Sequence, residues 1–80
     1  MQATSYVLVN VRAGKGREVF QKLQKMKCTY QVDAIAGPYD LVAIVQGADF
    51  NDIGRTVVER IQTIEGVERS ITCNVIRFEI

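Results

Sequence analysis

Residues that could take part in acid–base chemistry are few and scattered in this sequence. There is no histidine among the 80 residues. The polar candidates within apolar, strand-like stretches are Asn10, Asp33 and Asn74. General acid–base catalysis needs a positioned side chain that can take up and release a proton. A catalytic mechanism would therefore depend on a single carboxylate, which is weak support for an enzyme.

Metal, cofactor and phosphate binding have equally little support. Cys28 and Cys73 lie far apart, and no carboxylate cluster stands nearby to complete a zinc site. Their spacing is compatible with one disulfide, but in a cytosolic chain such thiols are more often reduced. The stretch "GKGRE", residues 14–18, could present a helix start to an anion. It lacks the P-loop pattern, so we interpret it as a plain helix start and predict no metal and no cofactor.

Length and charge restrict the class of protein further. Residues 1–80 predict one domain, in which 48% of residues are hydrophobic and the net charge is +1. Basic and acidic residues are interspersed, whereas a nucleic-acid-binding domain usually has a clustered basic face. No apolar run approaches the ~18 residues of a membrane span, and there is no leader-like start. We expect a cytoplasmic protein.

The first half of the chain predicts a strand, a helix and two more strands. Residues 4–14 are rich in β-branched and apolar types, which is typical of a strand. Apolar residues then recur with helical spacing over 19–26. Residues 29–37 alternate as a strand does, and 41–46, "LVAIVQ", form a third, strongly apolar strand. The turn "GPYD", residues 37–40, joins these two strands.

The second half predicts a helix followed by a last strand. Asp49 can cap the helix N-terminus, and Asp52 adds negative charge to the first turn. Apolar residues recur every three or four positions up to Ile64, and Gly66 is a typical helix stop. Residues 67–80 alternate apolar and polar types as a fourth strand.

The predicted fold class is α+β, a ferredoxin-like βαββαβ plait with both helices on one sheet face. Strands one and three are central in this plait, which suits their apolar sequences. Two helices cover only one face, yet "LVAIV" directs Val42 and Ile44 to one side and Leu41, Ala43 and Val45 to the other. We therefore expect a second copy to cover the open face in a two-fold dimer, a dimeric α+β barrel.

At this point the residues resemble a known family. The pattern of Gly37, Tyr39 and Asp40 before an apolar strand, with Gly66–Val67 and Thr72 near the last strand, is similar to the effector domain of Lrp/AsnC transcription regulators. That domain is called RAM, for regulation of amino acid metabolism. The resemblance extends over residues 4–80, and the predicted order of elements agrees with it.

The resemblance implies a stand-alone, amino-acid-binding regulatory module. Family effector domains dimerise through their sheets, often assemble into rings such as octamers, and bind amino acids between subunits. A full-length Lrp/AsnC regulator is a further partner that it implies. Family regulators carry an N-terminal helix-turn-helix, whereas this chain enters its first strand near Thr4. We therefore expect no direct binding to nucleic acid and no membrane association.

The ligand-binding residues that the resemblance implies are Gly37, Tyr39, Asp40, Thr72 and Asn74. Asp40 either meets the ligand ammonium or holds the turn, and it could equally be a turn former that accepts backbone N–H bonds. Gly37 supplies backbone freedom or room for a ligand, and Tyr39 packs at the interface. Thr72 and Asn74 donate to a ligand carboxylate across the interface, or are solvated edge residues.

Two other functions are compatible with a plait of this size. A small dimeric α+β barrel enzyme, of isomerase or monooxygenase type, is the alternative, although we expect the protein not to be an enzyme. An RNA-binding plait stacks bases on aromatic residues of its central strands. The central stretch "DLVAIVQG" has no aromatic residue, which argues against RNA binding.

Overall fold

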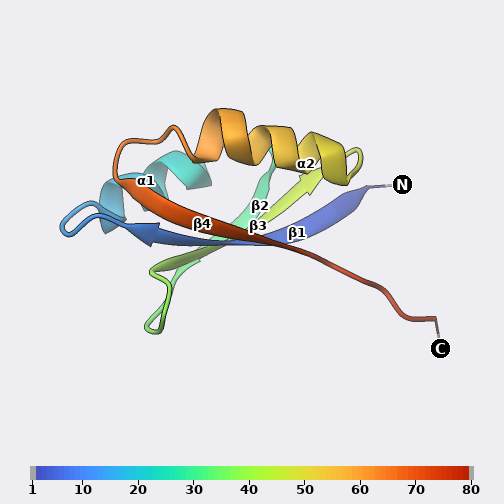
Figure 1. Cartoon of the computed structure of the whole chain (residues 1–80), viewed down its shortest axis with the longest axis horizontal. Helices are drawn as coiled ribbons and strands as arrows, with labels where there is room; N and C mark the ends of the chain where they lie inside the picture. The colour runs from blue at the N-terminus through green and yellow to red at the C-terminus, as the bar shows by residue number, and fades with distance from the viewer. Residues whose placement is uncertain (1, 80) are drawn as a thin grey trace.

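A computed structural model describes residues 2–79 as a sheet with helices on one side (Figure 1). The elements, in chain order, are β1 (Ala3–Val11), α1 (Gly16–Gln24), β2 (Thr29–Ala34), β3 (Leu41–Gly47), α2 (Phe50–Thr56), the π-helical η1 (Val57–Ile61) and β4 (Val67–Asn74). Within the described residues, no helix is long and apolar enough to cross a membrane. The predicted order of strands and helices is confirmed.

The four strands form one antiparallel sheet in the order β2-β3-β1-β4, so β1 and β3 are central. Figure 1 shows α1 and α2 on the same side of this sheet. This is the arrangement that right-handed strand–helix–strand connections produce. The predicted α+β, ferredoxin-like plait is therefore confirmed.

The core lies between the sheet and the helices. Alternate residues of β3, namely Leu41, Ala43 and Val45, are buried there beside Val7 and Val9 of β1. The helices contribute Val19, Leu23, Ile53, Val57 and Ile61. Each fully buried aliphatic side chain stabilises the fold by ~1.5–3 kcal/mol. Because side chains alternate along a strand, Val42 and Ile44 project from the opposite face, which we call the outer face.

The second helix begins where the sequence predicts, but its helical residues end at Ile61, before the predicted end at Ile64. Asp49 accepts a hydrogen bond from the Asp52 backbone N–H at 2.7 Å, which satisfies one free donor of the first turn. The helix then widens into η1, whose π-helical turn the sequence did not predict. Gly66 follows with φ of 102°, and a Cβ there would lie 2.8 Å from Lys15 Cβ. Both the backbone conformation and the close packing require glycine at this position.

Two strands end earlier than predicted because turns begin there. β1 ends at Val11 and not at residue 14, since the chain turns through Gly14 with φ of 83°. β2 ends at Ala34 and not at residue 37, since the Ile35 N–H donates to the Asp40 carbonyl at 2.9 Å and closes the β2–β3 turn.

The last strand is also shorter than predicted. β4 ends at Asn74, whereas the prediction ran to residue 80, which lies outside the described residues. Asn74 pairs with Ser5, so Thr4 and Ala3 of β1 lie beyond the last regular pair. A last backbone bond joins the Val75 N–H to the Thr4 carbonyl at 2.9 Å. Residues 75–79 then leave the sheet as an extended tail (Figure 1).

Candidate ligand-binding site

Three hydrogen bonds tie the β2–β3 turn to the end of β1. The Asp40 N–H donates to the Val9 carbonyl at 3.0 Å, and the Val11 N–H donates to Asp40 Oδ2 at 2.8 Å. Asn10 Nδ2 donates to the Pro38 carbonyl at 3.0 Å. The regular β1–β3 ladder ends at the pair of Val9 and Leu41. The Asp40 side chain accepts the N–H of Val11, which lies beyond that end.

Asp40 therefore ties the turn to β1, whereas the sequence-based interpretation expected its carboxylate to accept N–H groups of the turn itself. Its Oδ2 is occupied by the Val11 N–H. Its second carboxylate oxygen has no hydrogen-bond partner among residues 2–79. The residue is exposed, so this second oxygen can also meet a cation in solution. The holding role and a ligand-binding role are compatible in one side chain.

A hollow of about 470 Å³ lies beside this turn. Its lining residues are Asn10, Val11, Pro38, Asp40, Glu68 and Arg69. The volume falls within the ~300–1,000 Å³ of typical small-ligand pockets. Two carboxylates and one guanidinium border the same space. Such a hollow can offer a carboxylate to an ammonium and a guanidinium to a carboxylate, and charge-assisted hydrogen bonds of this kind are the stronger ones.

Arg69 and Glu68 were not among the residues predicted from the sequence. Arg69 lies opposite Asn10 in the β1–β4 pairing, and the register shifts between Asn10 and Val11. Asp40 reaches the same point from the β3 side through Val11. Val67 begins the last strand, opposite Val11 at the end of β1, and Arg69 follows two residues later. This position in the sequence is the signal that could have located Arg69.

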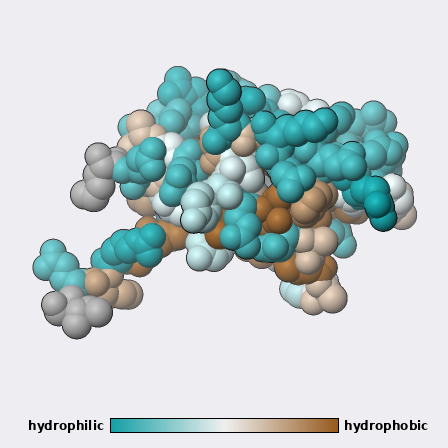
Figure 2. Space-filling model, turned by 180° about the vertical axis from the view of Figure 1, so that it is seen from behind, coloured by the Kyte–Doolittle hydropathy of each residue, from teal (hydrophilic) through white to brown (hydrophobic). Residues whose placement is uncertain are grey.

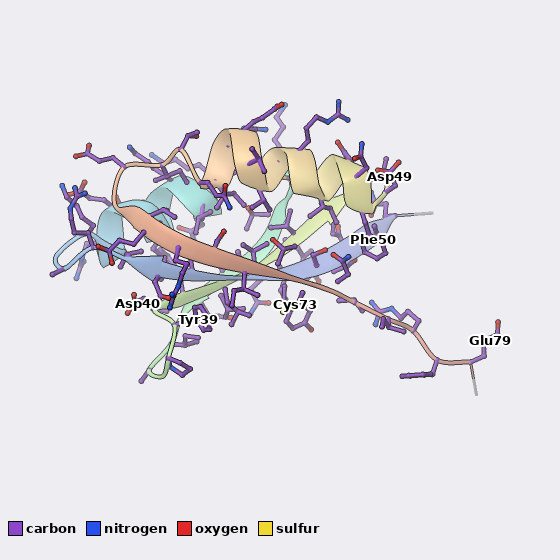
Figure 3. The ribbon with its side chains drawn as sticks, in the orientation of Figure 1. Tyr39, Asp40, Asp49, Phe50, Cys73 and Glu79 are labelled. Atoms are coloured by element: carbon purple, nitrogen blue, oxygen red, sulfur yellow. The ribbon has the colours of Figure 1, made fainter. Side chains whose placement is uncertain are left out.

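Gly37 and Tyr39 lie on the same turn but are positioned differently. Tyr39 is half-buried on the part of the turn below the sheet, away from the helices (Figure 3). Gly37 is not one of the glycines with positive φ, so the backbone freedom expected of it is not used here. No protein atom lies within 4 Å of the position that a Cβ would take. The space around Gly37 is open in the single chain.

Thr72 and Asn74 lie away from the turn within one chain. They stand opposite Val7 and Ser5 across the β1–β4 pairing, so they point to the helix side of the sheet, although both are exposed. Ser5 Oγ donates to Asn74 Oδ1 at 2.8 Å. The structure therefore brings Gly37, Tyr39 and Asp40 together and leaves Thr72 and Asn74 further along β4. A site that uses both groups requires a second copy of the chain.

A second hollow, of about 570 Å³, lies on the helix side of the turn. Asp40 and Val11 line it together with Phe20, Arg17 and Leu41. Asp40 thus stands between two hollows, and a change in its position would alter both.

Metal-binding groups are not gathered at this site. Among the described residues, no three His, Cys, Asp or Glu side chains are grouped as a metal site would require. Cys28 is half-buried and packs against the core, whereas Cys73 is exposed on the outer face opposite Tyr6. Both thiols are free.

Comparison with known proteins identifies relatives of two lengths. An uncharacterized HTH-type transcriptional regulator of Pyrococcus furiosus is 29% identical over 72 residues, which cover 86% of this chain and 48% of the regulator. The chain thus spans about half the length of the curated relatives it matches. A solved structure from Thermus thermophilus, TTHA0845, is 29% identical, with a TM-score of 0.90 and 98% of each chain covered.

A third similar structure has a ligand in its name. It is a transcriptional regulator of Neisseria meningitidis in complex with L-Met, 21% identical, with a TM-score of 0.84 over 94% of this chain and 50% of that one. At this identity the likeness concerns the fold. The model of the Lrp/AsnC ligand binding domain matches residues 4–78. With nearly its whole length matched by that model, this chain belongs to the Lrp/AsnC ligand-binding domain family.

Proposed function

We propose that residues 1–80 act as an amino-acid-binding regulatory module, with its ligand held at the β2–β3 turn between two copies of the chain. The observation that carries this proposal is that Asp40 and Arg69, which carry opposite charges, line one hollow. A free amino acid presents an ammonium and a carboxylate, which complement these two charges. Family membership favours this regulatory function over the small-enzyme alternative.

Assembly through the outer face is supported by its apolar side chains. Tyr6 and Ile71 are 47% and 44% exposed there, and Leu8, Val42 and Ile44 are half-buried. Figure 2 shows hydrophobic surface gathered below the sheet, while the helix side is hydrophilic. Contiguous apolar surface of this kind commonly marks a protein–protein interface. A two-fold dimer would cover it, and rings such as octamers would be built from such dimers.

A ligand site between copies also explains why the predicted site residues lie in two separate places in one chain. Asp40, Tyr39 and Gly37 of one copy would form one wall, and Thr72 and Asn74 of another copy would form the facing wall. Asn74 Oδ1 is occupied by Ser5, but its amide N–H groups can donate to a ligand carboxylate. Arg69 is the group we add to this set.

The regulatory output would be a change of assembly or of contact with a larger partner. The curated relatives are named HTH-type transcriptional regulators, and this chain matches about half of their length. A full-length Lrp/AsnC regulator that exposes the same kind of sheet therefore suits the role of partner by shape and by family. The L-Met complex of the Neisseria meningitidis relative supports amino acids as the ligand class.

A thermal-shift screen against the twenty amino acids tests the ligand class. A ligand present at about 100 times its Kd stabilises the protein by ~2.7 kcal/mol. For a domain of this size, we expect a Tm increase of roughly 10–20 °C for the cognate amino acid. The amide of that amino acid, which lacks the charged carboxylate, is the matched control and should give a smaller shift. No shift with any amino acid would contradict the proposal.

Duplex DNA is not expected to bind this 80-residue chain at physiological salt. The net charge is +1, so few counterions would be released on contact with phosphates. Fluorescence anisotropy with labelled duplexes at ~150 mM salt measures this. A sub-micromolar Kd for any duplex would show that the chain reads DNA without a further domain.

A further inference from the structure

The tail of residues 75–79 carries two apolar side chains that are not buried by the rest of their own chain. Ile76 is 75% exposed and Phe78 is 86% exposed, more than the other large hydrophobic residues described. The segment is neither helix nor strand. Figure 1 shows it running past the end of the sheet, on the side away from the helices.

The residues that alternate with these two, Val75 and Arg77, face their own chain. Val75 and Arg77 both line a hollow beside Phe50 and Ala3, at the root of the tail. In an extended segment, successive side chains point in opposite directions. Ile76 and Phe78 therefore point away from the hollow that Val75 and Arg77 line. The tail is attached through one row of side chains and presents the other, apolar row outward.

The exposed area of the chain is large for its mass. A compact monomer of 9.0 kDa is expected to expose about 4,900 Å². This chain exposes 5622 Å². The surplus of roughly 700 Å² is close to the ~800 Å² that each partner of a standard interface buries. Ile76 and Phe78 of the tail and Tyr6 and Ile71 of the outer face are among the exposed large hydrophobic residues that contribute to this area.

We propose that residues 75–79 form an exchange arm, which docks Ile76 and Phe78 on the outer sheet face of a second copy. The proposal builds on the assembly described under the proposed function and adds the segment that completes it. In a two-fold dimer each arm would cross to the other subunit, so both arms would be buried at once. Val75 would remain the anchor to the home chain through its bond to Thr4.

Sedimentation equilibrium on the full chain tests the arm. The double variant Ile76→Asp/Phe78→Asp is expected to raise the dimer Kd by about a hundredfold or more, because every dimer buries two copies of both side chains. The matched control is Val58→Asp, which places the same charge on an exposed apolar residue of η1. The control should associate as the wild type does. A wild-type Kd in the double variant would overturn the arm.

Photocrosslinking gives a readout that does not depend on stability. Benzoylphenylalanine is placed at position 78, and ¹⁴N- and ¹⁵N-labelled proteins are mixed before irradiation. We expect mixed-isotope crosslinks from position 78 to peptides of β1 and β3. Crosslinks within one chain only would show that the arm folds back and would overturn the proposal.

The outcomes separate the arm from the proposed function. A wild-type dimer that the double variant leaves intact contradicts the arm but not the outer-face assembly. A wild type that is monomeric at high concentration contradicts both. Stabilisation by an amino acid is measured on the wild-type chain in the thermal-shift screen. That measurement is separate from the experiments on the arm variants.

Discussion

Ile44→Asp is expected to convert the assembled protein into a folded monomer. Ile44 lies near the middle of β3 on the outer face, directly opposite Tyr6 of β1. In a sheet-to-sheet dimer two copies of this side chain would be buried, at ~1.5–3 kcal/mol each. Their loss alone would raise the dimer Kd by roughly two to four orders of magnitude, since each ~1.4 kcal/mol is tenfold. The two unpaired carboxylates would weaken the dimer further. Light scattering coupled to gel filtration measures the mass.

The neighbouring residue provides an internal control for this result. Val45 is fully buried on the helix side of the same strand. Val45→Asp places a charge in the core and is expected to unfold the chain, as far-UV circular dichroism would show. Ile44→Asp should keep a wild-type spectrum. If the Ile44 variant assembles like the wild type, the outer face is not the interface of the dimer.

The strand "LVAIV" shows how much of the fold could be predicted from sequence. Its five apolar residues could not all fit on the helix side, so the sequence alone required two covered faces. The structure decides which set is inside, burying Leu41, Ala43 and Val45. A local signal also held at Asp49, because a cap depends on neighbours within one turn, whereas Gly66 lies beyond the end of η1, in the turn that leads into β4.

The strand ends were predicted less well because they depend on distant parts of the chain. β4 alternates to residue 80 in sequence, but its regular pairing with β1 ends at Asn74 and Ser5, and the chain leaves the sheet after the Val75 N–H bonds to the Thr4 carbonyl. The outward row of the tail, Ile76 and Phe78, keeps the alternation of a strand without a strand to pair with. Periodicity indicates where a strand could form, whereas pairing determines where it ends.

The residues around the candidate site could be predicted only in part, for the same reason. Asp40 belongs to a short motif, so it could be found from neighbouring residues. Arg69 borders the same hollow only because β1 lies between β3 and β4 and because the register shifts at Asn10. Asp40 and Arg69 are far apart in the sequence, and no local pattern links them. Their proximity arises from the order of strands in the sheet and not from sequence spacing.

Asp40 supplies the second prediction, through a pair of variants. Asp40→Ala removes both the carboxylate charge and the acceptor for the Val11 N–H. Asp40→Asn removes the charge but keeps a side-chain oxygen that can accept the same bond. The hydrogen bond is exposed, so we expect Asp40→Ala to lose ~1 kcal/mol of stability or less, and Asp40→Asn to lose little. Thermal unfolding measures this difference.

The two variants separate the holding role from direct contact with the ligand. If the free carboxylate oxygen meets the ligand ammonium, both variants should weaken amino-acid binding by about tenfold or more, since hydrogen bonds to charged groups contribute ~1.5–3 kcal/mol. Titration calorimetry with the amino acid found in the thermal-shift screen measures the affinity. We expect this result, because Oδ2 is occupied by Val11 whereas the second oxygen has no hydrogen-bond partner among the described residues.

The opposite pattern would assign Asp40 to the turn alone. In that case Asp40→Asn would bind like the wild type, because the Val11 N–H keeps its acceptor and the β2–β3 turn keeps its place. Asp40→Ala would bind more weakly in proportion to the loosening of the turn. Wild-type affinity in both variants would remove Asp40 from the site, and the ammonium would then have to be met by other groups around the hollow, of which Glu68 is the remaining carboxylate.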